Sequence, residues 1–271
     1  MRPENFTFLR GLLRQHAGVL LEEGKEYLVL ARLGPLARRE SWGSVDDLIT
    51  HLRSRPNGDL RRQVAEAMVT TETSFFRDVH PFQTLKDVIF PDLIERRAGS
   101  RTLRIWSAAC AAGQEAYSVA MLLKEHFGEL PSWHVRIVAS DVSSAMIERA
   151  KLASYSQLEV NRGVPSHLLT RHFERDGLQW RVNEDIRQMV EFRQINLATP
   201  FPPLPEMDII FARNVLIYFD ETTRRQVLKR LAEHLRKDGF LFVGGAETMI
   251  AYADLFYRLQ IDRTSCYRPR R

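Results

Sequence analysis

The sequence predicts an α/β protein in which an all-helical segment precedes a mostly parallel sheet covered by helices on both faces. Three observations support this fold class. Residues 1–70 carry apolar residues at helical spacing and contain no clear strand. From about residue 100 onward, short apolar runs alternate with amphipathic stretches, which is the pattern of a parallel sheet. The length of 271 residues suits one large domain, or a large domain with a small one.

The N-terminal part is predicted to be helical from the spacing of its apolar residues. These residues recur at helical intervals within 8–13, 27–33, 45–52 and 60–68. Ser44 stands just before the third stretch, where its hydroxyl can cap a helix. We therefore expect a small all-helical domain.

The remaining chain is predicted to consist of alternating strands and helices. The expected strands are Leu103–Ala108, Val135–Ser140, Met207–Ala212 and Phe240–Val243, the last after a turn at Lys237-Asp238-Gly239. The expected helices are Gln114–Phe127, Ser143–Ala153 and Glu221–Arg236. Trp180–Val182 and Met189–Phe192 are expected to form an antiparallel pair or an excursion from the sheet.

Composition indicates a globular protein of a reducing compartment. The apolar runs are far too short to span a bilayer, and no long apolar segment near the N-terminus indicates a signal peptide. Cys110 and Cys266 are the only cysteines, which supports neither a disulfide framework nor a cysteine metal site. We therefore expect a cytoplasmic protein that has no metal and does not insert into membranes.

The charge balance leaves the type of partner open. The formal net charge is +5 and the isoelectric point is about 9.4, which is compatible with nucleic acid. Lysine and arginine are nevertheless spread among acidic residues, so an acidic protein partner explains the bias equally well.

Polar residues follow the first two expected strands, at the edge where open parallel sheets bind ligands. A loop of small residues, 109–113, follows the first strand and allows a ligand to approach the start of a helix. Glu115 lies in the first turn of that helix. Asp141 ends the second strand, where its carboxylate can accept both hydroxyls of an adenosine ribose. From these residues alone, helix capping by Asp141 and a favourable helix-dipole charge at Glu115 remain alternatives.

The loop after the first strand favours a particular class of cofactor. It contains a single glycine, so the dinucleotide fingerprint is absent. A sulfonium cofactor such as S-adenosylmethionine needs no phosphate cradle and is favoured by a nearby acid. Its methionyl end also requires a carboxylate for the ammonium group and a cation or amide for the carboxylate.

Longer motifs follow one another in one order across roughly residues 20–250. They are Val69-Thr70-Thr71-Glu72-Thr73-Ser74-Phe75-Phe76-Arg77-Asp78, Ile105-Trp106-Ser107-Ala108-Ala109-Cys110, Gly113-Gln114-Glu115-Ala116-Tyr117-Ser118, Ala139-Ser140-Asp141, Val190-Glu191-Phe192 with Asn196-Leu197, and Asp208-Ile209-Ile210-Phe211-Ala212-Arg213-Asn214-Val215-Leu216-Ile217-Tyr218-Phe219-Asp220. Together they resemble the signature of the chemotaxis receptor glutamate methyltransferases (CheR-type). Their number and order make the resemblance specific.

The resemblance implies a Rossmann-like class I methyltransferase sheet with a small antiparallel β-subdomain, preceded by an all-α domain. The implied division is residues 1–72 for the helical, receptor-facing domain and 73–271 for the methyltransferase domain. The β-subdomain is expected at about 174–194. The implied cofactor is S-adenosylmethionine, which becomes S-adenosylhomocysteine.

The resemblance also implies roles for individual residues. Thr73 and Arg77 would contact the methionyl end of the cofactor, and Glu115 its polar groups. The other cofactor contacts would be Asp141 at the ribose, Asn196 and Leu197 at the adenine, Arg213 and Asn214 near the sulfur, and Thr71. Arg77 and Tyr218 would flank the transferred methyl group and are the catalytic candidates. Without the resemblance, Phe75-Phe76-Arg77 could be an apolar anchor and Tyr218 a core aromatic residue.

Several positions depart from the family pattern. Thr71 stands where an asparagine is usual, Ala116 where a proline is usual, and Gly244-Gly245-Ala246-Glu247 where a Gly-His-Ser-Glu run is usual. We assign no role to the strand end at 244–247, because the histidine is missing. The hairpin at Arg175-Asp176-Gly177 lacks the Gly-x-Gly insertion of relatives that dock on a receptor's C-terminal pentapeptide. We therefore expect no dependence on such a tail.

By this resemblance the chain is expected to be a monomeric protein-glutamate O-methyltransferase that acts on chemoreceptor cytoplasmic helices and not on nucleic acid. Candidate contacts for those acidic helices are Lys25, Arg32, Arg38, Arg39, Arg61 and Arg62, with an ordinary solvated helix face as the alternative. A glutamate carboxylate, with a reference pKa of about 4.3, is already anionic at neutral pH and needs no general base. Two alternatives remain, a methyltransferase of another substrate class and a non-catalytic cofactor-binding signalling adaptor.

Overall fold

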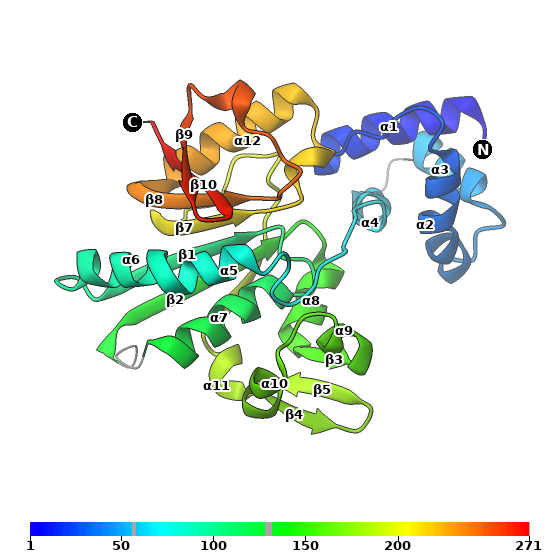
Figure 1. The fold of residues 1–271 in the computed structure, drawn as a ribbon. Helices are drawn as coiled ribbons and strands as arrows, with labels where there is room; N and C mark the ends of the chain where they lie inside the picture. Colours follow the sequence, from blue (N-terminus) through cyan, green and yellow to red (C-terminus); the bar gives the residue numbers. More distant parts are fainter. Residues whose placement is uncertain (56–57, 128–131, 271) are drawn as a thin grey trace.

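The computed structural model describes residues 1–55, 58–127 and 132–270, and its N-terminal part is a helical domain. Its helices pack around one apolar core, at the upper right of Figure 1: α1 Pro3–Ala17, α2 Glu26–Arg39, α3 Val45–Ser54 and α4 Gly58–Ala67. The core contains apolar residues whose spacing predicted the helices, among them Leu9, Leu33 and Leu48. The Ser44 hydroxyl accepts a hydrogen bond from the Asp47 amide at 3.1 Å, which confirms the expected helix cap.

The rest of the chain is organised around a seven-stranded sheet with the order β6-β2-β1-β7-β8-β10-β9. Its strands are β1 Thr102–Ala108, β2 His134–Asp141, β6 Val190–Gln194, β7 Met207–Ala212, β8 Leu235–Val243, β9 Phe256–Ile261 and β10 Thr264–Pro269. Neighbouring strands are parallel except for the pairs that β10 makes with β8 and β9. The strand order reverses between β1 and β7, so the carboxyl ends of these strands border the expected ligand crevice.

Helices cover both faces of this sheet (Figure 1). One face carries α7 Gln114–His126 and a continuous helical segment, which comprises α5 His80–Thr84, a π-helical turn at Leu85–Ile89 and α6 Phe90–Arg97. The other face carries α12 Glu221–His234, while α8 Ser144–Leu152 contacts β2 and β6. Ile105 faces the first layer and its neighbour Trp106 the second. Burial on both faces explains the apolar runs at Ile105-Trp106 in β1 and Ile209–Ala212 in β7. None of the helices in the described residues is long and apolar enough to cross a lipid bilayer.

A small antiparallel sheet projects from the main domain, at the bottom of Figure 1. It contains β3 Ser154–Ser156, β5 Gln179–Val182 and β4 Phe173–Asp176 in that order, accompanied by α9 Gln157–Asn161, α10 Ser166–His172 and α11 Glu184–Arg187. The expected pairing of Trp180–Val182 with Met189–Phe192 is wrong. The first segment pairs with β3 and β4, and the second lies in β6, which pairs with β2 in parallel. The small sheet therefore spans residues 154–182 instead of about 174–194.

The chain after α12 also differs from the expected helix, turn and short strand. α12 ends at His234 and β8 begins at Leu235, so Lys237-Asp238-Gly239 lies inside the strand. The ladder with β7 shifts register near its start, and this irregularity accommodates the polar residues. A Cβ atom on Gly239 would lie 2.8 Å from the carbonyl oxygen of Asp208, so glycine is required there. Strands β9 and β10 were not expected from the sequence.

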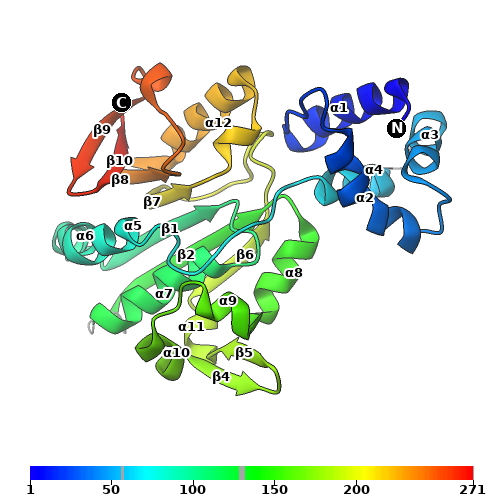
Figure 2. The same cartoon turned by 45° about the vertical axis from the view of Figure 1, so that its right-hand side comes forward.

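The helical domain closes over the carboxyl ends of the central strands (Figure 2). Val19 and Phe219 form an antiparallel bridge between the two parts, and the Leu20 amide donates to the Tyr218 carbonyl at 2.8 Å. Arg14 adds an ion pair with Asp220 at 2.9 Å. The fold thereby places the loop after α1 beside the crevice at the β1–β7 boundary.

Candidate active site

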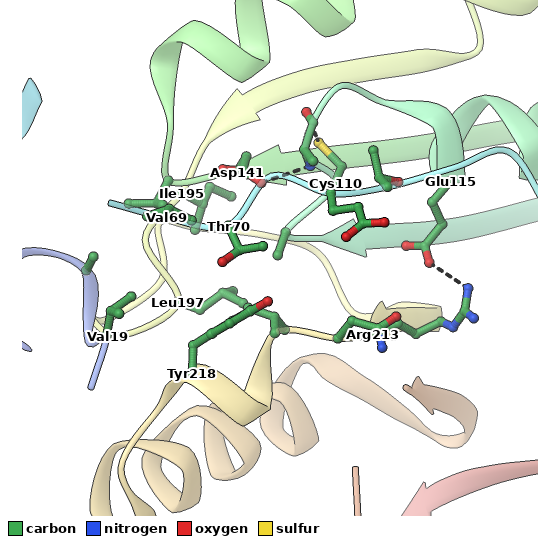
Figure 3. A pocket seen from close by; sticks show the side chains of 18 of the residues that line it. Val19, Val69, Thr70, Cys110, Glu115, Asp141, Ile195, Leu197, Arg213 and Tyr218 are labelled. Carbon is green, nitrogen blue, oxygen red and sulfur yellow. Dashed lines mark hydrogen bonds and ion pairs between the residues drawn. The ribbon is translucent and has the colours of Figure 1, made fainter. Parts of the chain in front are cut away.

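A cavity with about 840 Å³ of empty space, partly open to solvent, lies at these strand ends (Figure 3). It gathers all but one of the residues that the sequence singled out: Thr73, Arg77, Glu115, Asp141, Asn196, Leu197, Arg213, Asn214 and Tyr218 line it. Thr71 is not among the lining residues, whereas its neighbour Thr70 is. A cofactor contact by Thr71 therefore stays a prediction without support from the geometry.

Asp141 brings a buried carboxylate to the cavity from the end of β2. Its side chain is 5% exposed, and its oxygens accept hydrogen bonds from the amides of Ala111 and Ser143, both at 2.9 Å. Burial raises the pKa of this carboxyl although the amides stabilise the anion. Ser143, and not Asp141, caps α8. Each carboxylate oxygen keeps a second lone pair, so Asp141 can also accept the hydroxyls of a ribose.

Arg213 forms the centre of an ion-pair cluster at the other end of the cavity. Its side chain is 2% exposed and donates to Glu115 at 3.1 Å, to Asp78 at 2.6 Å and to the Arg77 carbonyl at 3.0 Å. Glu115 also accepts from the Ser107 hydroxyl at 2.7 Å. Figure 3 shows the contact between Arg213 and Glu115. The cluster joins the end of β7, the first turn of α7 and the segment before α5, and presents both charges that an amino acid requires.

The segment 69–78 lies along the cavity and is anchored by its two phenylalanines. Phe75 is buried, and its ring packs edge to face against two aromatic rings of the β-subdomain. The Phe76 amide donates to the Ser118 hydroxyl at 3.0 Å. Arg77, in contrast, is half-buried and donates to a backbone carbonyl of its own segment at 3.3 Å. The apolar-anchor alternative therefore holds for the phenylalanines, while the Arg77 guanidinium remains accessible from the cavity.

Non-glycine residues with left-handed backbone gather in the loops around this cavity. They are Phe76, Asp78, Val79, Ala109, Ala111 and Asn214, with φ between 47° and 67°. Such conformations cost of order 1–3 kcal/mol each and persist only where surrounding contacts hold them. The loops at the border of the cavity are therefore held in strained conformations by the contacts around them.

Asn196 and Leu197 form the end of the cavity that adjoins the helical domain. The Asn196 side-chain amide donates to the His16 carbonyl at 2.7 Å, and its oxygen accepts from the Ala198 amide at 2.9 Å. The side chain of Asn196 therefore links the two domains. Only the main chain of this residue is then available to contact a ligand. Leu197 and Val19 supply apolar surface for a flat ring (Figure 3).

Tyr218 ends the short 3-10 helix η3 (Leu216–Tyr218) and points into the cavity in Figure 3. Its side chain is half-buried, and its hydroxyl makes no hydrogen bond with the described part of the chain. Its backbone is fixed, because the carbonyl accepts from the Leu20 amide. Tyr218 is therefore a cavity residue with a free hydroxyl and not a core aromatic residue.

The cavity suits a ligand that carries adenosine at one end and an amino acid at the other. Apolar surface lies beside Leu197, a ribose acceptor at Asp141, and paired charges at Arg213 and Glu115. The Nε atom of Arg213 is buried without a partner in the described chain, so the site retains an unused donor. Within residues 1–55, 58–127 and 132–270, no cluster of three or more potential metal ligands is found.

The sequence did not indicate that residues of the helical domain line the cavity. Ala17, the last residue of α1, and Val19, in the loop that follows, line the cavity. Between them Gly18 has φ 68°, and a Cβ atom there would lie 2.6 Å from the Ala198 side chain. A glycine after an amphipathic helix predicts a helix end, but no local motif indicates this long-range contact.

Known proteins resemble this chain in both of its parts. A family model described as the CheR methyltransferase all-alpha domain matches residues 4–69, and one described as the CheR methyltransferase SAM binding domain matches residues 71–265. The chemotaxis protein methyltransferase Cher2 of Pseudomonas putida is 38% identical over 94% of each chain. Chemotaxis protein methyltransferase 1 of Pseudomonas aeruginosa is 38% identical over 98% of each chain. The chemotaxis protein methyltransferase of Vibrio parahaemolyticus is 36% identical over 90% of this chain and 89% of its own.

Proposed function

Because the chain belongs to the CheR methyltransferase family, we propose that it transfers the methyl group of S-adenosylmethionine to glutamate carboxylates of a chemoreceptor. Membership of the family establishes a chemotaxis methyltransferase that depends on S-adenosylmethionine. The identity of the acceptor, a glutamate carboxylate, is what we propose. The observation that carries the proposal is that Arg77, Asp141, Arg213 and Tyr218 line one cavity beneath the helical domain.

The lining residues support one orientation of the cofactor. Asp141 would accept the ribose hydroxyls, and the main chain at Asn196 with the Leu197 side chain would border the adenine. The cluster of Arg213 and Glu115 would hold the charged methionyl end, with Thr73, Arg77 and Asn214 closing that side. When bound, the cofactor would supply a sulfonium methyl group. A carboxylate oxygen would form a bond to the methyl carbon in line as the carbon–sulfur bond breaks, giving a neutral methyl ester and releasing the neutral thioether S-adenosylhomocysteine.

A glutamate side chain suits this cavity because it is already an anion at neutral pH. Opposite charges cancel during transfer, so alignment and exclusion of water promote the reaction more than a strong cationic grip. Arg213 is paired with Asp78 and Glu115 and is assigned to the methionyl end of the cofactor, so it is not left to hold the substrate carboxylate. Half-buried Arg77 can steer the incoming carboxylate, and the Tyr218 hydroxyl can align it.

The short β4–β5 hairpin supports recognition without a receptor tail. It turns at Gly177-Leu178 and carries no longer insertion. We infer that the helical domain, residues 1–72, meets the acidic receptor helices with exposed cations such as Arg38 and Arg39. Arg32 is not available for this role, because it donates to the Met68 carbonyl and the Thr70 hydroxyl. We further propose that the enzyme is monomeric and cytoplasmic and that its methyltransferase domain begins at residue 73.

Methyl-labelled cofactor tests the acceptor directly. The full-length enzyme should transfer label to chemoreceptor in native membranes, and mild base should release that label as methanol, because carboxyl esters are base-labile. Receptor lacking its C-terminal residues should be labelled equally well. Label that resists base would indicate another acceptor group. Cofactor binding without transfer would indicate a non-catalytic adaptor.

Asp141→Ala should weaken binding of S-adenosylmethionine and S-adenosylhomocysteine alike, by about 1–3 kcal/mol, because two buried hydroxyls lose their acceptor. Titration calorimetry with both ligands measures the loss. Asp141→Asn is the matched control, since its side-chain oxygen can still accept from the Ala111 amide and support the loop. Unchanged affinity in both variants would remove Asp141 from the site.

A further inference from the structure

Glu247 is a buried carboxylate beside the active site but outside the cofactor cavity. Glu247 lies in the loop after β8 and is 8% exposed. It is not among the residues that line the cavity. In the described part of the chain no lysine, arginine or histidine forms an ion pair with it. Its partners are backbone groups.

Three backbone amides donate to this carboxylate. Oε2 accepts from Asn214 at 2.9 Å and from Gly244 at 2.6 Å, and Oε1 accepts from Ile217 at 3.2 Å. Hydrogen bonds to an ionised acceptor are about twice as strong as neutral ones. The carboxylate thereby ties the loop after β7 to the loop after β8.

The conformations of both loops agree with such a constraint. Asn214 has φ 57°, a left-handed conformation that surrounding contacts must hold. A Cβ atom on Gly244 would lie 2.6 Å from the Asn214 side-chain nitrogen and 2.9 Å from the Glu247 carboxylate. Only glycine allows the loops to approach this closely.

The contact extends to Tyr218 through the 3-10 turn. Ile217, whose amide Glu247 accepts, directly precedes Tyr218 in η3. Arg224 holds the acceptor side of the same turn, since it donates to the carbonyls of Leu216 and Phe219, both at 2.9 Å. Glu247 therefore binds a backbone amide of the turn that carries the proposed catalytic tyrosine, and Arg224 binds backbone carbonyls of the same turn.

We propose that Glu247 is a positioning residue for methyl transfer, whose carboxylate sets the places of Asn214 and Tyr218 without touching cofactor or substrate. The inference rests on the proposed function, because it assigns roles to those two residues. Alanine would leave three amides unpaired. Glutamine keeps one oxygen that can accept two of the bonds, but its amide nitrogen would face the third amide as a second donor.

Glu247→Ala should lower kcat for receptor methylation about 100-fold, because a misplacement of about 1 Å near the reacting atoms costs that much. The KM for receptor should not change. Glu247→Gln should recover much of the rate. Hydrogen exchange of the free protein should be faster at the amides of Asn214, Ile217 and Gly244 in Glu247→Ala, a readout that requires no substrate.

Glu125→Ala is the matched control, because Glu125 is a largely buried carboxylate that pairs with His172 at 2.7 Å and with Arg171, away from the cavity. It should lose stability and keep kcat. Parental kcat or unchanged exchange in Glu247→Ala would overturn the inference, as would an equal loss of kcat in Glu125→Ala. A wild-type enzyme that does not esterify receptor would instead refute the proposed function, while the exchange result would still test the loop contact.

Discussion

Replacing Arg77 by alanine should lower kcat/KM for receptor methylation by about 10²–10⁴-fold. Each charge-assisted hydrogen bond contributes about 1.5–3 kcal/mol, and the guanidinium is proposed to make one to the cofactor and one to the substrate carboxylate. The side chain is half-buried and makes a single long bond to a backbone carbonyl, so its loss should not disturb the fold. Labelled-methyl kinetics and titration calorimetry should show losses in both turnover and cofactor affinity.

Tyr218→Phe separates chemistry from binding in the same experiment. Its hydroxyl makes no hydrogen bond within the described residues, so cofactor affinity should stay nearly intact while the single-turnover rate falls. Arg77→Lys keeps the charge but loses the planar fork, and it should recover only part of the activity. Parental rate and affinity in Arg77→Ala would exclude both assigned contacts. A parental rate in Tyr218→Phe would deny its hydroxyl a catalytic role.

Local patterns predicted the central part of the fold and failed where pairing depends on distant segments. β1, β2 and β7 were predictable because the parts of them that are buried on both faces consist mainly of apolar residues. The strand Val190–Gln194 was assigned to the wrong partner. It pairs with β2, and which edge of β2 is free depends on how the whole sheet assembles. β9 exposes Arg258 and Gln260, and its weaker apolar signal was not detected.

The candidate site was predictable for a different reason. Its residues lie at strand ends or in recognisable motifs, and parallel strands bring such ends together. The contribution of Ala17 and Val19 depends on how the two domains pack, which no local pattern encodes. Glu247 received no role because its run lacks the usual histidine. Its partners are backbone amides, and these carry no signal in a sequence.

Arg97→Ala should reduce the free energy of unfolding by about 3 kcal/mol, because removing one partner of a buried ion pair costs roughly 3–5 kcal/mol. The Arg97 side chain is 10% exposed and donates to Asp208 at 2.8 Å and to Asp238 at 2.7 and 2.9 Å. Asp208 is fully buried and would keep only the Arg104 amide at 2.9 Å and Arg236 at 3.4 Å. This partial compensation places the expected loss at the lower end.

The ion pair between Arg97 and Asp238 should also make the stability of the protein depend on pH at acidic pH. The hydrogen bond from Arg97 lowers the pKa of Asp238 from 3.8 to about 2. A carboxyl whose pKa is lowered by folding stabilises the protein above its ordinary pKa, and that contribution is lost as the pH falls through the folded value. Between about pH 4 and pH 2, the parent should therefore lose stability more steeply than Arg97→Ala.

Urea unfolding followed by tryptophan fluorescence measures both effects, since Trp106 is fully buried in β1. Arg136→Ala is the control, because its pair with Glu191 is 44% and 41% exposed and should contribute no more than about 1 kcal/mol. Arg97 pairs with the start of β7, at the opposite end from the cavity, so cofactor affinity should be unchanged. Equal losses in the two variants would show that the buried pair is no stronger than a surface pair. A loss of cofactor affinity in Arg97→Ala would instead mean that the two ends of β7 are coupled.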